Sequence, residues 1–308
     1  MSEKTTCKEA VLLGLYDCLL FLIRLTPKLM IPYVAQGVCF FGRRFVRRDV
    51  GILRDNLEQV LDIPKGCFAA EKFEKRTFFN HVCSALETLK SCCNPDKLQI
   101  EGKEKLSELI EKGRKEGSGC LFITAHLGSW EVIGWVLSKL SNSKCHVLAR
   151  QPNCKALRRF FEKFRDRLGM EVLFADRPLI LRDMVKALKS GGFLAVAMDQ
   201  RPVGGRRASV EFFGRETDFV CGPAIAAGMA GCPVVAVFCV RKGPMQYELI
   251  SREVVPTGHD ISDTNELTQI MATEIERVVN LYPEQWAWHY DRWQIEESIA
   301  PVVPEPAS

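Results

Sequence analysis

The sequence has no apolar run long enough to cross a bilayer as a single helix. The run over residues 10–23 is interrupted by Asp17 and is shorter than the roughly 20 residues that a spanning helix needs. The next apolar stretch, residues 29–41, follows Arg24 and Lys28. No small-residue cleavage site is evident, so we do not expect a cleaved signal peptide. Two half-length apolar helices flanked by basic residues predict an interfacial or re-entrant membrane anchor, with the rest of the chain on the cytoplasmic side.

The sequence also lacks the spacing of a metal site or a disulfide framework. Its 13 cysteines are irregularly spaced, include no CxxC pair and form no zinc pattern with the histidines. Several, including Cys120 and Cys239, lie in apolar runs, where cysteine behaves as a small core residue. We therefore expect reduced thiols in a cytoplasmic compartment and no metal.

A strong overall charge is missing as well. The formal net charge is +4, which gives no reason to expect a nucleic-acid partner. The charges are uneven, however, because residues 24–48 contain basic side chains and no acidic one. Such a cluster beside apolar segments suits an anionic membrane surface or an acidic partner, and a solvated helix face is the alternative. The basic residues are Arg24, Lys28, Arg43, Arg44, Arg47 and Arg48.

Changes of pattern divide the chain, which has no internal repeat, into four regions. We expect membrane-associating helices in residues 1–48, a helical region in 49–117, an α/β core in 118–294 and a disordered tail in 295–308. In the core, apolar runs that suit strands alternate with amphipathic runs that suit helices. This alternation predicts the α/β class, with a mostly parallel central sheet flanked by helices and preceded by the anchoring region. The expected strands are 119–125, 145–150, 171–175, 193–199, 233–241 and 246–251, and the expected helices are 129–140, 154–168, 178–189, 222–230 and 261–280.

The strongest chemical signal is a histidine at the exit of the first core strand. His126 follows the apolar run 120–123, and Glu131 comes five positions later, in the first turn of the next predicted helix. A neutral imidazole held by a carboxylate can take a proton from an alcohol near neutral pH. On one continuous helix this spacing would put the two side chains about 140° apart, so the turn at Gly128 has to bring them together. The alternative is a histidine satisfied inside a core.

A second acid competes for the same role. Asp199 ends the apolar run 193–198, and the carboxyl ends of parallel strands meet at one edge of a sheet, where Arg150 is also expected. We favour Glu131 as the partner of His126 and keep Asp199 as the alternative. Ser129 does not lie in a G-x-S-x-G elbow, so we assign it a capping role rather than that of a nucleophile. Backbone amides around Gly128 are candidate oxyanion donors.

Several blocks, taken in order, carry a family resemblance. The His-x4-Glu block resembles the signature of the glycerolipid acyltransferase superfamily. Together with the later blocks it resembles the late acyltransferases of lipid A biosynthesis, the lauroyl and myristoyl transferases, from about Arg47 to Trp293. The later blocks are Asp199-Gln200, Gly204-Gly205, Phe212-Phe213-Gly214-Arg215, Gly222-Pro223-Ala224, Pro283-Glu284-Gln285-Trp286-Ala287-Trp288 and Arg292-Trp293.

This resemblance implies an O-acyltransferase at the cytoplasmic face of the inner membrane. It would move a fatty acyl chain from acyl carrier protein (ACP), or from acyl-CoA, to a hydroxyl of a lipid A precursor or a related glycolipid, with no further cofactor. His126 would be the general base, supported by Glu131 or Asp199. Because acceptors in the family carry phosphates, Arg150, Arg215, Gly214 and Gly128 are expected to bind substrate, with Arg165 and Arg167 as further candidates.

Other functions stay open at this point. The acceptor could be a mannosylated or amino-acid-containing lipid, or His126 could activate water in a lipid or thioester hydrolase. The tryptophans of the C-terminal block could form an acyl pocket or a membrane-interface belt, or could pack that segment onto the sheet. The basic residues 43–48 could recruit the acidic ACP.

Overall fold

The computed structural model describes residues 14, 18–42, 45–91, 97–117, 119–141, 145–152, 154–259 and 263–293. Several sequence predictions lie wholly or partly outside these residues. They concern Arg43 and Arg44 of the basic cluster, the tail over 295–308, most of residues 1–17 of the expected anchor, and the start of the expected helix 261–280. The division into four regions stays a prediction.

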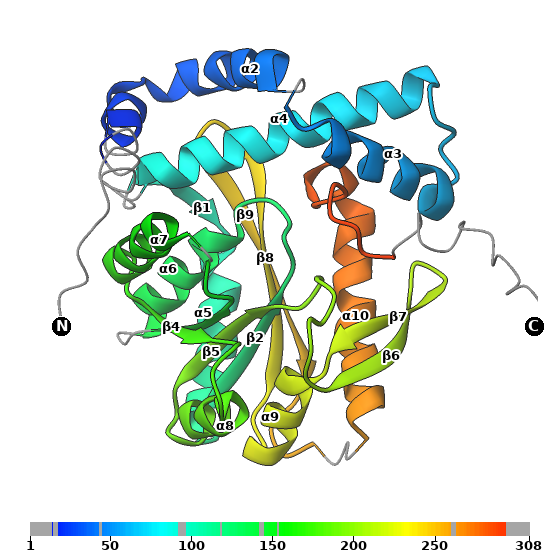
Figure 1. The fold of residues 1–308 in the computed structure, drawn as a ribbon. Coiled ribbons are helices and arrows are strands. Elements are labelled where there is room, and N and C mark those ends of the chain that lie inside the picture. Colours follow the sequence, from blue (N-terminus) through cyan, green and yellow to red (C-terminus); the bar gives the residue numbers. More distant parts are fainter. Residues whose placement is uncertain are drawn as a thin grey trace, which may run out of the picture.

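A seven-stranded sheet forms the centre of the fold, in the order β1-β9-β8-β2-β5-β3-β4 (Figure 1). Every neighbouring pair is parallel except β8 and β9, which form an antiparallel pair. The predicted α/β class, with a mostly parallel sheet and flanking helices, is therefore confirmed. The strands are β1 (Gln99–Glu101), β2 (Cys120–Thr124), β3 (Cys145–Ala149), β4 (Met170–Phe174), β5 (Phe193–Ala197), β8 (Val234–Gly243) and β9 (Gln246–Val255).

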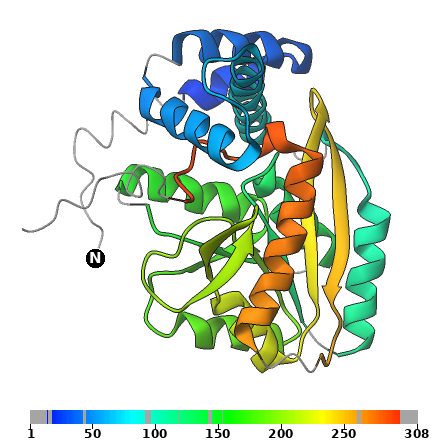
Figure 2. The same cartoon turned by 90° about the vertical axis from the view of Figure 1, so that its right-hand side faces the viewer.

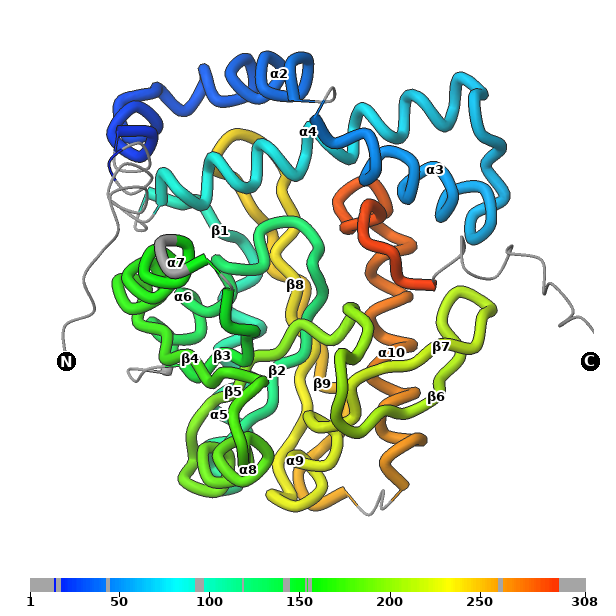
Figure 3. The backbone as a smooth tube through the Cα atoms, viewed as in Figure 1, coloured from blue at the N-terminus to red at the C-terminus, as the bar shows by residue number. Residues whose placement is uncertain are grey.

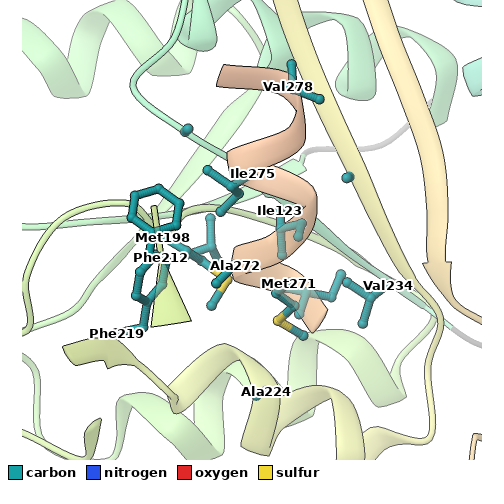
Figure 4. Close-up of a cluster of buried hydrophobic side chains, with 14 of the residues drawn as sticks. Ile123, Met198, Phe212, Phe219, Ala224, Val234, Met271, Ala272, Ile275 and Val278 are labelled. Carbon is teal, nitrogen blue, oxygen red and sulfur yellow. The ribbon is translucent and has the colours of Figure 1, made fainter. Parts of the chain in front are cut away.

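Helices cover both faces of this sheet, because successive side chains of a buried strand point to opposite faces. Leu121 and Ile123 of β2 belong to one apolar cluster with α8, α9 and α10, whereas Phe122 belongs to a second cluster with α5 and α6. Figure 2 shows α5 and α10 on opposite sides of the long strands, and Figure 4 shows Ile123 beside Ile275 of α10. The helices of the core are α5 (Lys103–Lys115), α6 (Trp130–Ser141), α7 (Lys155–Arg167), α8 (Ile180–Lys189), α9 (Gly222–Ala230) and α10 (Thr264–Leu281).

A two-stranded antiparallel hairpin, β6 (Arg207–Phe212) and β7 (Arg215–Val220), lies outside the main sheet and was not predicted. Its two-residue turn consists of Phe213 and Gly214, both with positive φ. Such a turn is usually marked in a sequence by Asn-Gly or Asp-Gly, and phenylalanine in the first position hides it. The three-residue strand β1 was missed as well, because it is too short to show a periodicity.

The helices that precede the sheet lie across its upper end in Figure 1, and the first described one is Cys18–Leu25. After it come α2 (Ile31–Gly42), which follows the short 3-10 turn η1 (Lys28–Met30), α3 (Arg47–Leu61) and α4 (Phe68–Ser91). Leu53 and Leu57 of α3 are fully buried in the same cluster as β2, so α3 packs directly onto the core. The segment that contains Pro64, Lys65 and Gly66 separates α3 from α4.

The N-terminal helices expose many large apolar side chains. No described helix is by itself long and apolar enough to cross a membrane, although the pair Cys18–Leu25 and Lys28–Gly42, bent by 107°, reaches that length and apolarity together. The expected membrane anchor thus stays a prediction. The exposed apolar residues of this region are Leu19, Phe21, Leu22, Leu25, Leu29, Met30, Tyr33, Val34, Val38, Phe40 and Phe41.

Candidate active site

The register of two adjacent strands brings His126 and Asp199 together. In the parallel pair β2 and β5, Thr124 lies opposite Ala197, and each of the two functional residues stands two positions further along its strand. His126 Nδ1 lies 2.7 Å from Asp199 Oδ1, and the backbone N–H of His126 donates to Oδ2 at 2.9 Å. With Nδ1–H directed to the carboxylate, the lone pair of the imidazole is on Nε2.

The electrostatics of this pair suit a base that is held by an ionised acid. Burial lowers the pKa of His126, but the charge and the hydrogen bond of Asp199 outweigh it, so the net pKa lies above the ordinary value of 6.5. Burial raises the pKa of Asp199, but the charge of His126 and the hydrogen bonds that the carboxylate accepts bring the net pKa below the ordinary value. Asp199 is therefore ionised at neutral pH.

The preference for Glu131 as the partner of His126 was wrong in its geometry. Glu131 opens α6 and forms a bidentate ion pair with Arg165 of α7, in which Arg165 Nη2 and Nε lie 2.5 and 3.2 Å from its two carboxylate oxygens. Its charge still acts on His126 through space, and it adds a little to the raised pKa. The turn at Gly128 directs Glu131 towards α7 instead of towards the imidazole.

The turn between β2 and α6 is compact because Gly128 has a φ of +60° and lies against β8. A Cβ atom at this position would come within 2.2 Å of the carbonyl oxygen of Cys239. The N–H groups of Gly128 and Ser129 donate to the carbonyls of Gln285 and Cys239, each at 2.9 Å. These two amides are thus occupied, which corrects their assignment as oxyanion donors. The first N–H groups of α6, at Trp130 and Glu131, stand where a helix has no intrahelical acceptor.

Ser129 does not cap the helix. Its side chain is buried, and among the described residues its hydroxyl makes no capping hydrogen bond and lies near the hydroxyl of Tyr247. Tyr247 in turn donates to Glu87 of α4, which also holds Arg241 of β8 through hydrogen bonds of 2.9–3.1 Å. Glu87 thus packs in a buried ion pair that ties α4 to the sheet.

Two cavities meet at His126. One has a volume of about 280 Å³ and mixed walls, in which apolar side chains of the sheet stand beside polar groups at the carboxyl ends of β2, β3 and β5, among them Arg150, Gln200 and Arg201; we call it the polar cavity for these groups. The other has a volume of about 470 Å³ and lies between α4 and α7, with mostly apolar walls. Both cavities share the side chains of His126, Trp130, Glu131, Phe161 and Arg165.

The predicted substrate-binding residues divide into two groups. Arg150 lines the polar cavity, and its Nη2 donates to the carbonyl of Arg201 at 3.2 Å. Arg215 instead lies at the start of β7, where its Nη2 donates to the carbonyl of Gln59 in α3 at 2.7 Å. Arg215 and Gly214 are absent from the walls of both cavities, as the described residues define them. The hairpin turns them towards α3.

The tryptophan block packs the C-terminal segment, residues 283–293, onto the core. Trp286 and Trp288 are 2% and 0% exposed, and their rings meet at 4.6 Å between centroids. Asn56 of α3 donates to the carbonyls of Trp288 and Tyr290. Arg292 is buried over the ring of Phe219 at 4.2 Å, and burial lowers its pKa to about 10.

Sequence reasoning missed several residues that surround His126. The T-shaped contact of Trp130 with the imidazole, at 5.1 Å between centroids, follows from its place in the motif and was predictable. Arg201 and Phe161 carry no sequence signal, because their relation to His126 depends on strand order and on the placement of α7. Trp286 donates its indole N–H to Asp199 Oδ2 at 2.8 Å across 87 positions, which no local pattern announces.

Comparisons with known proteins identify the family of the chain. The profile of the family described as bacterial lipid A biosynthesis acyltransferase matches residues 3–295. A phosphatidylinositol mannoside acyltransferase of Mycolicibacterium smegmatis is 24% identical over 283 residues, which cover 88% of each chain. A phosphatidylinositol mannoside acyltransferase of Mycobacterium tuberculosis is 22% identical over 267 residues, covering 82% of this chain and 80% of the relative. The chain belongs to the bacterial lipid A biosynthesis acyltransferase family, and it is an acyltransferase.

Proposed function

We propose that the protein transfers a fatty acyl chain from a thioester to a hydroxyl of a phosphate-bearing glycolipid. The observation that carries this proposal is the position of the His126–Asp199 pair, which lies where a polar and an apolar cavity meet. An acyl transferase has to hold an alcohol and an apolar acyl chain at one base, and this arrangement offers a place for each.

In the proposed mechanism the acceptor attacks the thioester directly. Asp199 holds the Nδ1–H of His126, so that Nε2 takes the proton of the acceptor hydroxyl while the hydroxyl oxygen attacks the thioester carbonyl. The tetrahedral oxyanion then collapses, the carbon–sulfur bond breaks, and the thiolate leaves and receives the proton from His126. An acyl-enzyme on Ser129 is disfavoured because that hydroxyl is buried and, among the described residues, makes no hydrogen bond to His126 that could activate it.

The apolar cavity supplies the place for the acyl chain. Its walls include Leu89 of α4 and Phe160, Phe161 and Phe164 of α7. Mostly apolar walls with a few polar groups at one end are typical of sites that bind such chains. The end with His126 and Arg165 would then hold the thioester carbonyl, where the guanidinium can stabilise the developing oxyanion.

The polar cavity supports an anionic acceptor. Three guanidinium groups, those of Arg150, Arg165 and Arg201, line it together with the carboxylate of Glu131. Guanidinium groups bind phosphate through paired hydrogen bonds, so the excess of positive charge fits a phosphate-bearing lipid headgroup. A lipid A precursor, expected from the sequence, and a mannosylated phospholipid, suggested by the names of the relatives, both meet this description.

We further propose that the enzyme works at the cytoplasmic face of the plasma membrane. The exposed apolar side chains of the N-terminal helices and the basic residues Arg24, Lys28, Arg47 and Arg48 support contact with an anionic bilayer. The donor would be acyl-ACP or acyl-CoA. ACP is acidic, and the basic residues 43–48 offer a complementary charge.

The test is a reconstituted assay with the full chain in anionic lipid vesicles. Acyl-ACP or acyl-CoA is supplied with a lipid A precursor, with phosphatidylinositol mannoside, or with no acceptor, and products are identified by mass spectrometry alongside thiol release. We expect an acylated glycolipid and thiol release that depends on the acceptor, both abolished in His126→Ala.

Two outcomes would overturn the proposal. Thiol release that is independent of any acceptor would identify a thioester hydrolase instead. Full activity in His126→Ala, with its fold verified by circular dichroism, would remove the assigned base.

A further inference from the structure

The C-terminal segment pairs with the catalytic turn as a short piece of sheet. Trp286 forms an antiparallel bridge with Leu127, and the N–H of Ala287 donates to the carbonyl of His126 at 3.1 Å. The carbonyl of Gln285 accepts the N–H of Gly128. Figure 3 shows this segment, in red, running beneath α3 after the end of α10. The backbone of His126 is therefore held by residues about 160 positions away.

The same segment reaches the acid of the pair. The indole N–H of Trp286 donates to Asp199 Oδ2 at 2.8 Å, and the backbone N–H of His126 donates to the same oxygen at 2.9 Å. Asp199 Oδ1 faces His126 Nδ1 at 2.7 Å. The carboxylate thus accepts hydrogen bonds from three donors, which fix its rotation and direct Oδ1 at the imidazole.

The indole itself cannot move easily. Trp286 is 2% exposed, and its ring stacks on Phe213 at 5.9 Å and meets Trp293 at 6.0 Å between centroids. A donor held by such packing acts as a fixed dipole, and it costs no reorganisation when the charge on His126 changes. Without it, Oδ2 would keep only the backbone N–H, and the carboxylate could rotate away from Nδ1.

We propose that Trp286 is a positioning residue of the His126–Asp199 pair, acting through its indole N–H. The proposal rests on the proposed function, because it assigns Trp286 a part in keeping His126 competent as the base. Trp286 itself is absent from the walls of both cavities, as the described residues define them, so it lies outside the two proposed substrate sites. Its effect should reach the reaction through Asp199 alone.

The chain offers a matched control in Trp288. This residue is also fully buried in the aromatic cluster, and its indole N–H donates at the same distance, 2.8 Å, to the carbonyl of Pro283. The variants Trp286→Phe and Trp288→Phe each remove one indole N–H from the same cluster. Only the first removes a hydrogen bond from Asp199.

The experiment combines these variants with Asp199→Ala in the acyl-transfer assay. We expect Trp286→Phe to lower kcat by about tenfold or more, the usual scale for a lost hydrogen bond to a charged group, with KM unchanged for both substrates. We expect Trp288→Phe to lower kcat much less. Added to Asp199→Ala, Trp286→Phe should lower kcat no further, because the carboxylate on which it acts is gone.

The opposite results overturn the proposal. Equal losses in Trp286→Phe and Trp288→Phe, or the same loss from Trp286→Phe with and without Asp199, would leave Trp286 a merely structural role. If Trp286→Phe unfolds, benzothienylalanine at position 286, which keeps the bicyclic shape and replaces N–H by sulfur, decides the question in the same way. Failure of the proposed function is distinguishable, because the wild-type protein would then transfer no acyl group to any acceptor.

Discussion

Replacing Asp199 by Asn tests the assignment of the acid most directly. The change keeps the size of the side chain, removes its charge and exchanges one acceptor oxygen for an NH2 donor. In the structure both oxygens are acceptors, Oδ1 of one N–H and Oδ2 of two. The asparagine NH2 group will therefore take the place of Oδ1, where it opposes one donor instead of two.

This orientation inverts the tautomer of His126. Facing an NH2 group, Nδ1 has to accept, so the ring proton moves to Nε2 and the lone pair needed to deprotonate the acceptor is lost. We expect kcat/KM to fall by about 10³- to 10⁴-fold, the scale on which a base held in the wrong tautomer loses activity. That corresponds to about 4 to 5.5 kcal/mol of transition-state stabilisation.

The pH dependence of kcat/KM provides a second test of the Asp199→Asn substitution. The pKa of His126 lies above 6.5 because Asp199 outweighs the lowering effect of burial. In the wild type, kcat/KM should therefore fall as the pH drops through this raised pKa, since only the neutral imidazole is a base. Without the charge of Asp199, burial dominates, so the pKa of His126 drops and the acid limb moves to lower pH.

The assay measures initial rates of acyl transfer across the pH range in which the fold is stable. Glu131→Gln is the control, because that carboxylate binds Arg165 and acts on His126 only through space. It should move the acid limb much less than Asp199→Asn does. The reasoning is refuted if Asp199→Asn keeps kcat/KM within a few fold of the wild type, or if Glu131→Gln moves the acid limb further.

Three further predictions concern residues around the site. Gly128→Ala should lower the free energy of unfolding by about 2 kcal/mol or more, because Gly128 has a positive φ and the added Cβ would collide with the carbonyl of Cys239. Gly51→Ala in α3 is the control in the same thermal unfolding experiment, and it should be neutral or stabilising because the space around Gly51 is open. Glu87→Ala should lower the free energy of unfolding, measured with urea, by about 3–5 kcal/mol, because it leaves the buried side chains of Arg241 and Tyr247 without their partner. A decrease of less than about 1 kcal/mol would contradict this expectation. Arg215→Ala should lower the free energy of unfolding by about 1 kcal/mol and leave the KM for the acceptor unchanged, since the guanidinium of Arg215 binds the carbonyl of Gln59. Arg201→Ala should raise the KM for the acceptor, because Arg201 lines the polar cavity. A raised KM in Arg215→Ala and an unchanged KM in Arg201→Ala would restore the sequence-based assignment of Arg215.

Much of the secondary structure could be predicted because it follows from local pattern. The apolar runs that end before His126 and Asp199 form strands β2 and β5 as predicted, and both residues lie at carboxyl ends of the sheet. Their meeting also depends on β2 and β5 being neighbours with Thr124 opposite Ala197. This register brings together residues that are 73 positions apart, and the periodicity within either strand does not predict it.

The choice between Glu131 and Asp199 as the partner of His126 also depends on contacts between distant segments, which local sequence patterns do not predict. Glu131 is nearer to His126 in the sequence, and a local argument prefers it. The backbone conformation of Gly128 and the docking of its amide on Gln285 decide where α6 begins and where Glu131 points. They direct Glu131 towards Arg165 and leave the imidazole to Asp199.

The sequence by itself determined the α/β class, the positions of most strands and helices, the family, and His126 as the candidate base. These follow from apolar periodicity and from motif residues that are contiguous in the chain. The tertiary structure alone decided the partner of that base, the occupied amides of Gly128 and Ser129, and the contact of Trp286 with Asp199. Each of these is a hydrogen bond between segments far apart in the chain, so it depends on strand order and helix docking, which no local pattern encodes.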